Sequence, residues 1–178
     1  MKKLLLHACC APCGAYSREY LTEQGYDVIY YFYNPNIFPK EEYNRRLEEL
    51  LRYCKEQNIP IIVEEADFEN WDKAVFGFED EPEKGKRCRI CYGIRIAKTA
   101  QKAKELGFEC FTTTLSISPH KSYEMIKEIS EKLSEETGIE YTDVNLKKND
   151  GYKKSVALSQ KYGFYRQDYC GCKFSIRK

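Results

Sequence analysis

The segment DVIYYFY, residues 27–33, is the part of the sequence that indicates the fold class most directly. After Asp27 it is continuously apolar and rich in branched and aromatic side chains, without the polar–apolar alternation of a half-exposed strand. A strand of this kind is buried on both faces, as in parallel sheets that helices cover on both sides. We therefore expect residues 27–33 to form a central strand of an α/β sheet.

Strand and helix patterns alternate on both sides of this segment, and a glycine ends most of the helical patterns. Further strands are expected at residues 3–7, 60–65, 108–114 and 140–145, and helices at residues 15–24, 40–57, 70–78, 89–106, 123–137 and 151–162. Such alternation predicts an α/β fold, a parallel sheet of about five strands with helices on both faces. We expect one domain spanning residues 1–178, with an irregular tail that folds back over the carboxyl ends of the strands.

Composition and charge leave the binding partner open. The chain has 178 residues with 29 Lys and Arg against 28 Asp and Glu, a net charge of +1, which argues neither for nor against nucleic-acid binding. No apolar run is long enough to span a membrane, and the apolar start at residues 4–6 is too short for a signal peptide. The expected location is therefore the cytoplasm, with no membrane partner.

Seven of the nine cysteines fall into three tight groups, which are Cys9-Cys10-x-x-Cys13, Cys88-x-x-Cys91 and Cys170-x-Cys172. Close spacing lets one loop present several thiolates to one ion or cluster. In a cytosolic protein, clustered cysteines bind metal or carry out redox chemistry more often than they form structural disulfides. The two remaining cysteines, Cys54 and Cys110, lie on the apolar face of a helix and in a buried strand, and we expect them in the core.

Residue spacing leaves the metal undecided. A closed zinc site needs four ligands and would leave three thiols unexplained, whereas an iron–sulfur cluster takes four thiolates and leaves others for a second role. Soft thiolates suit both metals. A disulfide between Cys170 and Cys172 would close a small, strained ring, and strained disulfides are easily reduced and tend to be catalytic ones. The alternative is that these two cysteines are metal ligands or inert tail thiols.

Three loops are expected to meet at one edge of the sheet, because ligands of such folds lie beyond the carboxyl ends of the strands. The loops are residues 9–14, 33–38 and 113–120. His7, at the end of the first strand, is a candidate ligand or proton donor but is more typical of a structural histidine, and His120 is a second candidate. Basic residues near this edge could follow a phosphate backbone, although each one alone is more typical of solvated surface charge; they include Arg46, Arg87, Arg95, Lys121 and Lys147.

The combined motifs resemble the QueH-type epoxyqueuosine reductases over nearly the whole chain. The resemblance rests on HACCAPCGAYS at residues 7–17, YNPNIFP.EEY..R at residues 33–46, RCRICYGIRIAKTAQKAKELGFECFTTTLSISPHKS at residues 87–122, and YRQDYCGCKFS at residues 165–175. This family is similar to HUP-type Rossmann-like domains. The resemblance implies an iron–sulfur oxidoreductase that reduces the epoxide of epoxyqueuosine in tRNA to the cyclopentene of queuosine without cobalamin.

The resemblance also implies a distribution of roles among the cysteines. Cys9, Cys10, Cys88 and Cys91 are the expected ligands of a [4Fe-4S] cluster, and Cys170 with Cys172 the redox-active pair. Cys13 is expected near an additional mononuclear iron. The expected partners are tRNA carrying epoxyqueuosine and an external electron donor. The family reads Ser-Pro-Tyr where this chain has Ser-Pro-His at residues 118–120, which leaves the role of His120 open.

ATP is not an expected ligand. HUP-type domains that use ATP carry a glycine-rich phosphate loop after the first strand, and here proline and cysteines stand in that turn. Two other functions remain open at this point. One is a zinc-binding nucleic-acid module, and the other is a metal-free thiol–disulfide oxidoreductase, which would leave Cys9, Cys10 and Cys13 without a role.

Overall fold

A computed structural model of the chain describes residues 1–176 and contains a five-stranded parallel sheet. The strands are β1 (Lys2–His7), β2 (Tyr26–Phe32), β3 (Ile61–Val63), β4 (Cys110–Thr113) and β5 (Glu140–Tyr141), in the order β3-β2-β1-β4-β5. All four neighbouring pairs run parallel. The predicted fold class is therefore confirmed, with β1 rather than β2 at the centre of the sheet.

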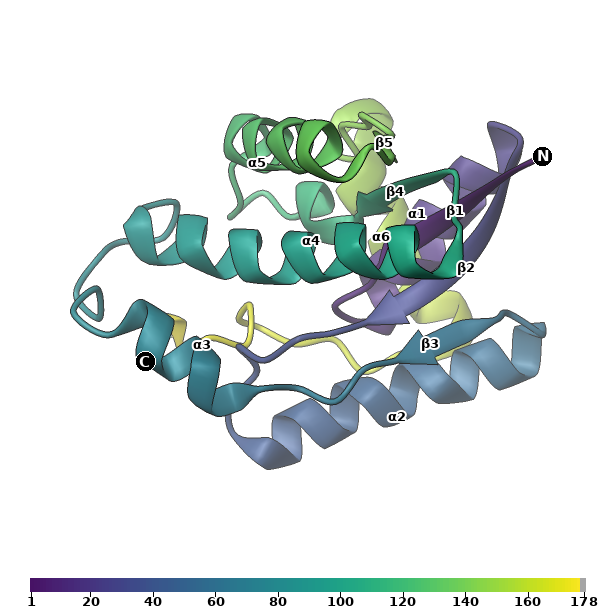
Figure 1. Cartoon of the computed structure of the whole chain (residues 1–178). Coiled ribbons are helices and arrows are strands. Elements are labelled where there is room, and N and C mark those ends of the chain that lie inside the picture. The colour runs from purple at the N-terminus through teal and green to yellow at the C-terminus, as the bar shows by residue number, and fades with distance from the viewer. Residues whose placement is uncertain (177–178) are drawn as a thin grey trace.

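Helices cover both faces of this sheet. The helices are α1 (Ala11–Glu23), α2 (Lys40–Gln57), α3 (Phe68–Val75), α4 (Lys86–Leu106), α5 (Tyr123–Thr137) and α6 (Gly151–Tyr162), and short 3-10 turns occur at Thr114–Ile117, Lys148–Asp150 and Lys173–Ser175. Figure 1 shows α4 and α5 in front of the sheet and α1 and α6 behind it. Among residues 1–176, none of the helices combines the length and the apolar composition that crossing a bilayer requires.

The core is divided into two layers by the sheet itself. Leu4 and Leu6 of β1 pack with α1 and α2 on one face, while Leu5 packs with α4 and α5 on the other, and all three side chains are fully buried. Tyr31 of β2 likewise joins the α4 face, while its neighbour Tyr30 joins the α1 face. Burial on both faces explains why these strands are continuously apolar in sequence.

Three helices begin earlier than expected, namely α1, α3 and α4, and two of them, α1 and α4, carry cysteines. Helix α1 begins at Ala11 rather than residue 15, because Cys10 adopts the extended N-cap conformation and Pro12 fits the first turn of a helix. Helix α4 begins at Lys86 rather than residue 89, after Gly85. The prediction that Cys13 precedes its helix is thus wrong: Cys13 lies in the first turn of α1. Cys88 likewise lies inside α4 rather than just before it.

One glycine at the start of α6 is required by close packing. An ideal Cβ on Gly151 would lie 1.7 Å from the carbonyl oxygen of Leu146, which belongs to the backbone and cannot rotate away. We expect Gly151→Ala to lower the free energy of unfolding by about 3 kcal/mol, because the backbone between residues 146 and 151 must move. Urea unfolding of the metal-free protein measures this.

Gly93→Ala is the matched control. A Cβ on Gly93, in the interior of α4, would have no neighbour within 4 Å. Alanine is favoured over glycine inside a helix by roughly 0.5–1 kcal/mol. We therefore expect Gly93→Ala to be neutral or stabilising; a Gly151→Ala protein as stable as this control would show that the close approach at Gly151 is not rigid.

Candidate metal and substrate site

The candidate site lies between β1 and β4, where the order in which the chain adds strands to the sheet reverses. Strands β1 and β4 are neighbours, and the helices that follow them, α1 and α5, pack on opposite faces. The loops that leave the two strands therefore separate and open a crevice at their carboxyl ends. A cavity of about 390 Å³ fills this crevice, and Cys9, Cys13, Cys88, Cys91, Cys170 and Cys172 all line it. We refer to it as the cysteine cavity.

The turn between β1 and α1 brings three sulfur atoms together. The Sγ atoms of Cys9, Cys10 and Cys13 all lie within 4.8 Å of one another, and those of Cys9 and Cys10 are 3.7 Å apart. This closeness follows from the local backbone, since Cys10 is the N-cap of α1 and Cys13 is its third residue. Cys10 is 1% exposed and does not reach the cavity wall, so it differs from the other six clustered cysteines.

Helix α4 supplies the second pair. Cys88 and Cys91 both line the cavity, and Cys91 packs in an apolar cluster with Trp71 of α3 and Cys172 of the tail. Cys88 is half-buried. Segments far apart in sequence thus place their thiols around the same cavity. All nine cysteines lie within residues 1–176, and each carries a free thiol in this structure.

The tail cysteines are held at the cavity by an arginine on α2. Arg46 donates from Nη1 to the carbonyl oxygen of Cys170 at 3.0 Å and from Nη2 to that of Tyr169 at 2.9 Å. The backbone N–H of Phe38 donates to the carbonyl oxygen of Gly171 at 2.8 Å. Gly171 has φ +112°, which disfavours any other residue there. In Figure 1 the yellow tail passes from α6 back across the molecule and ends near α3.

Neighbouring groups make the clustered thiols unequal. Hydrogen bonding with Cys10 and Cys13 lowers the pKa of Cys9 well below its usual value, and the Lys121 charge adds to this. Burial would raise the pKa of Cys170, but the Lys121 charge and a hydrogen bond with Ser175 outweigh it and lower the value. Cys9 and Cys170 are therefore the thiols most ready to act as thiolates.

The net shift is opposite for the second tail cysteine. Burial raises the pKa of Cys172, and the nearby Cys170 charge adds to this. The two tail thiols thus differ, with Cys170 the more acidic and Cys172 the less acidic of the pair.

The two histidines occupy different environments. His7 is fully buried; its Nδ1 lies 2.9 Å from Thr113 Oγ1, and its Nε2 lies 3.0 Å from Asn34 Oδ1. Burial lowers the pKa of His7 to about 4, so the ring is neutral and ties β1 to β4 and to the loop after β2. His120 lines the mouth of the cysteine cavity, 3.8 Å from Glu83. Its role stays a prediction.

The structure places the remaining predicted residues as follows. Cys54 and Cys110 are buried in the core, as expected. Arg46, Arg95 and Lys121 line the cysteine cavity but are 2%, 2% and 9% exposed, so they are not solvated surface charges. Arg46 lies between Tyr43 and Leu50 on the apolar side of α2, a position that by itself does not distinguish a buried arginine from one that reaches solvent. Trp71, which covers Cys91, was not among the expected site residues.

Comparison with known proteins identifies the family. A family model described as epoxyqueuosine reductase QueH matches residues 4–178. The chain belongs to the QueH family. Curated QueH members include that of Acinetobacter baylyi, 43% identical over 98% of this chain and 81% of its own length. The QueH of Streptococcus pyogenes is 42% identical over 98% and 70%, and that of Thermotoga maritima is 36% identical over 99% and 91%.

Solved structures share the fold at much lower identity. One, described as a predicted subunit of a tRNA methyltransferase from Methanocaldococcus jannaschii, has a TM-score of 0.61 at 16% identity and covers 90% of this chain and 75% of its own. Another is the U34-tRNA thiolase NcsA from Methanococcus maripaludis with its [4Fe-4S] cluster, at a TM-score of 0.61 and 12% identity, covering 99% and 62%. These likenesses support the Rossmann-like fold that was predicted for this QueH member.

Proposed function

We propose that this protein is an epoxyqueuosine reductase, which converts the epoxide of epoxyqueuosine in tRNA to the cyclopentene of queuosine. The observation that carries the proposal is the convergence of six cysteines on one cavity at the carboxyl edge of the sheet. The family to which the chain belongs is described as epoxyqueuosine reductase QueH, and this description specifies the reaction that we propose. The cysteines supply the redox groups that the reaction needs.

The donor set at the cavity fits a [4Fe-4S] cluster. Cys9, Cys10 and Cys13 form a group of soft donors within bonding distance of a common centre, and the group contains no carboxylate or histidine. We propose that Cys9, Cys10, Cys88 and Cys91 hold the cluster and that Cys13 lies beside an additional iron. When bound, a [4Fe-4S] cluster supplies electrons one at a time.

The two tail thiols can supply the electrons and protons that the overall reaction consumes. Removing the epoxide oxygen takes two electrons and two protons and yields an alkene and water. Oxidation of Cys170 and Cys172 to a disulfide releases two electrons and two protons, so one dithiol balances one turnover. An external reductant then restores the two thiols. Both side chains line the cavity in which the epoxide would lie.

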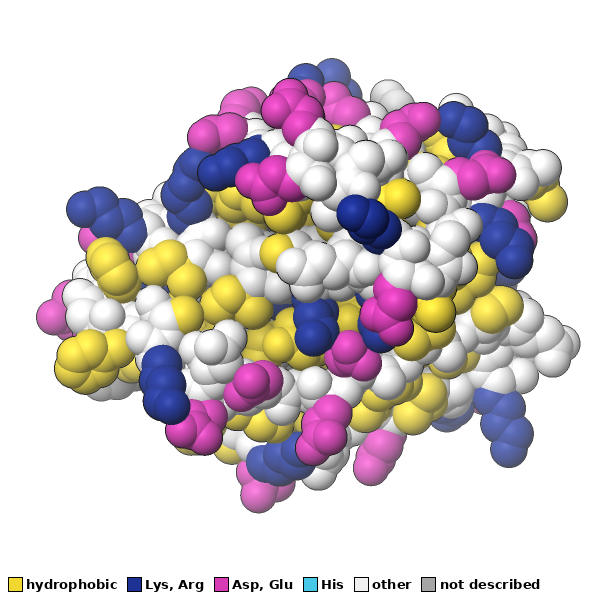
Figure 2. Space-filling view, in the orientation of Figure 1, with side chains coloured by type: hydrophobic (Ala, Val, Ile, Leu, Met, Phe, Trp, Pro, Cys, Tyr) yellow, Lys and Arg dark blue, Asp and Glu magenta, His cyan; other side chains and the backbone are white. Residues whose placement is uncertain are grey.

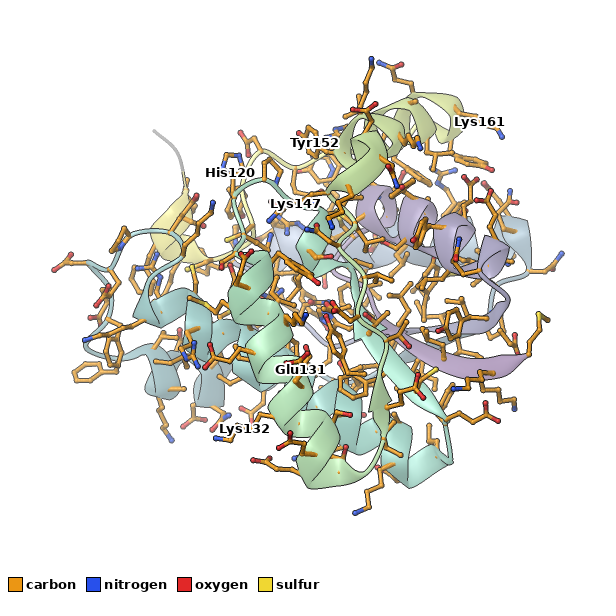
Figure 3. All side chains as sticks on the ribbon, turned by 90° about the horizontal axis from the view of Figure 1, so that it is seen from above. His120, Glu131, Lys132, Lys147, Tyr152 and Lys161 are labelled. Atoms are coloured by element: carbon orange, nitrogen blue, oxygen red, sulfur yellow. The ribbon has the colours of Figure 1, made fainter. Side chains whose placement is uncertain are left out.

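The mouth of the cavity suits an unpaired nucleotide. Tyr152, Tyr169 and His120 line it and offer rings on which a base can stack. Figure 3 shows His120, Lys147 and Tyr152 on the same side of the molecule, with Lys161 farther along α6. On the face seen in Figure 2, basic and acidic side chains are interspersed. We propose that local contacts at the mouth, rather than overall charge, bind the tRNA.

The first test is the metal content of anaerobically purified protein. We expect about four acid-labile sulfides with four or five irons per chain, because one [4Fe-4S] cluster and one further iron are proposed. A fifth iron supports the second metal site. Zinc without labile sulfide would contradict the reductase proposal and favour a zinc-binding nucleic-acid module; activity that survives chelation would favour a metal-free thiol–disulfide oxidoreductase.

A further inference from the structure

Arg95 is a buried cation on the wall of the cysteine cavity. It lies on α4 one helical turn after Cys91, is 2% exposed, and donates from Nε to the carbonyl oxygen of Cys91 at 3.4 Å. Its guanidinium reaches the same cavity as the cysteines. A buried guanidinium is costly unless an opposite charge or several acceptors satisfy it.

Two other buried arginines of the cavity have a carboxylate or several carbonyl oxygens as partners. Arg46 pairs with Glu42 at 2.8 Å and binds two carbonyl oxygens of the tail. Arg87 donates from Nη1 to the carbonyl oxygens of three residues in the loop before α4. Within residues 1–176, the Arg95 side chain has no carboxylate within ion-pair distance, and the bond from Nε to the carbonyl oxygen of Cys91 is its one hydrogen bond.

The negative charges that Arg95 faces are sulfurs. Cys91, Cys9 and Cys170 line the same cavity as Arg95, whose guanidinium carbon also lies 6.0 Å from the centre of the Tyr92 ring. These three cysteines come from α4, the β1–α1 turn and the tail, so the guanidinium lies among all three groups of clustered thiols. The environment is thus built around a cation whose counter-charge is carried by sulfur.

We propose that Arg95 is the counter-ion of the thiolate-bound [4Fe-4S] cluster and raises its reduction potential. A cluster held by four thiolates is anionic, and reduction adds a further negative charge. A fixed positive charge in a buried, low-dielectric site stabilises the reduced form more than the oxidised form. Arg95 is a positioning residue in this scheme: it acts on the substrate through the cluster. The inference rests on the cluster of the proposed function.

The experiment compares the midpoint potential of the reconstituted cluster in four proteins by a redox titration followed by electron paramagnetic resonance. Arg95→Met removes the charge and keeps much of the side-chain volume, and Arg95→Lys keeps the charge. Lys98→Met is the matched control, because it removes the same charge from the same helix at a residue that is 41% exposed and pairs with Glu64. Charges at such an exposed position are screened by water.

We expect Arg95→Met to lower the one-electron reduction equilibrium constant at least tenfold, a shift of 59 mV or more to lower potential. Arg95→Lys should remain within threefold of the wild type, and so should Lys98→Met. If Arg95→Met does not take up a cluster, Arg95→Gln is measured in its place. If both neutral variants lose the cluster while Arg95→Lys keeps it, the cluster requires a positive charge at this position, which also supports the inference.

Two outcomes contradict the inference, and both differ from failure of the proposed function. An unchanged potential in Arg95→Met, with a raised KM for tRNA, would assign Arg95 to substrate binding. If Arg95→Lys lowers the midpoint potential as much as Arg95→Met does, the shape of the Arg95 side chain and not its charge sets the potential. Wild-type protein that holds no labile sulfide would instead overturn the proposed function, and the counter-ion role with it.

Discussion

Replacing Cys9 with serine is expected to abolish assembly of the iron–sulfur cluster while leaving the fold intact. Cys9 belongs to the group of three thiols within 4.8 Å of one another and lines the cysteine cavity. Its low pKa makes it the thiol of this group that binds metal most readily. A serine hydroxyl is a much poorer ligand for iron. We expect iron and labile sulfide to fall to less than about a tenth of wild-type content.

The measurement is iron and sulfide analysis, with circular dichroism as the check on folding. Cys110→Ser is the matched control: Cys110 is buried in β4, away from the cavity, and its thiol contacts the carbonyl oxygen of Lys3, which a hydroxyl can also do. The control should keep the full cluster. A Cys9→Ser protein with wild-type iron and sulfide would remove Cys9 from the ligand set.

Replacing either tail cysteine with serine is expected to stop turnover without loss of the cluster. The proposed dithiol must give up two electrons, and a single remaining thiol cannot close a disulfide. We expect Cys170→Ser and Cys172→Ser each to lower kcat by at least about a hundredfold, with iron and sulfide at wild-type content. The double variant should be no worse than either single one, because the two thiols act as a unit.

Steady-state assays with epoxyqueuosine-containing tRNA and an external reductant measure this effect. Metal analysis of the same samples is the control, since it separates loss of the redox pair from loss of a ligand. Full turnover in both single variants with an intact cluster would show that the dithiol has no role. Loss of iron in either variant would instead place that cysteine among the metal ligands.

The sequence predicted the architecture because local signals and long-range packing agree. Helix α2 begins after Pro39, and helices α5 and α6 end at Gly138 and Gly163, which both adopt the left-handed conformation. These single residues allowed the helix limits to be predicted. Strand β5 is two residues long, much shorter than the strand expected at residues 140–145. β5 pairs with Cys110 and Phe111 while β4 continues to Thr113, and no local signal marks where the pairing stops.

Residue spacing indicated the cysteine groups, but not their surroundings. Metal-binding cysteines are recognisable because several must come from one turn. Arg46 and Arg95 are different: a charged residue on an apolar helix face has the same pattern whether it reaches solvent or is buried against a partner. Burial of Arg46 depends on the tail, which is more than 120 residues away in sequence. That dependence is invisible to any local pattern.

The arginine clamp on the tail also imposes an order on assembly. Arg46 and Cys170 are 124 positions apart, so the contact forms only after the chain has been synthesised well beyond the sheet. Cys9, Cys10, Cys13, Cys88 and Cys91 all precede β4 and can gather while the tail wall of the cavity is still missing. During biosynthesis there is thus an interval in which these five thiols are present before the tail, with Cys170 and Cys172, can complete the wall of the cavity.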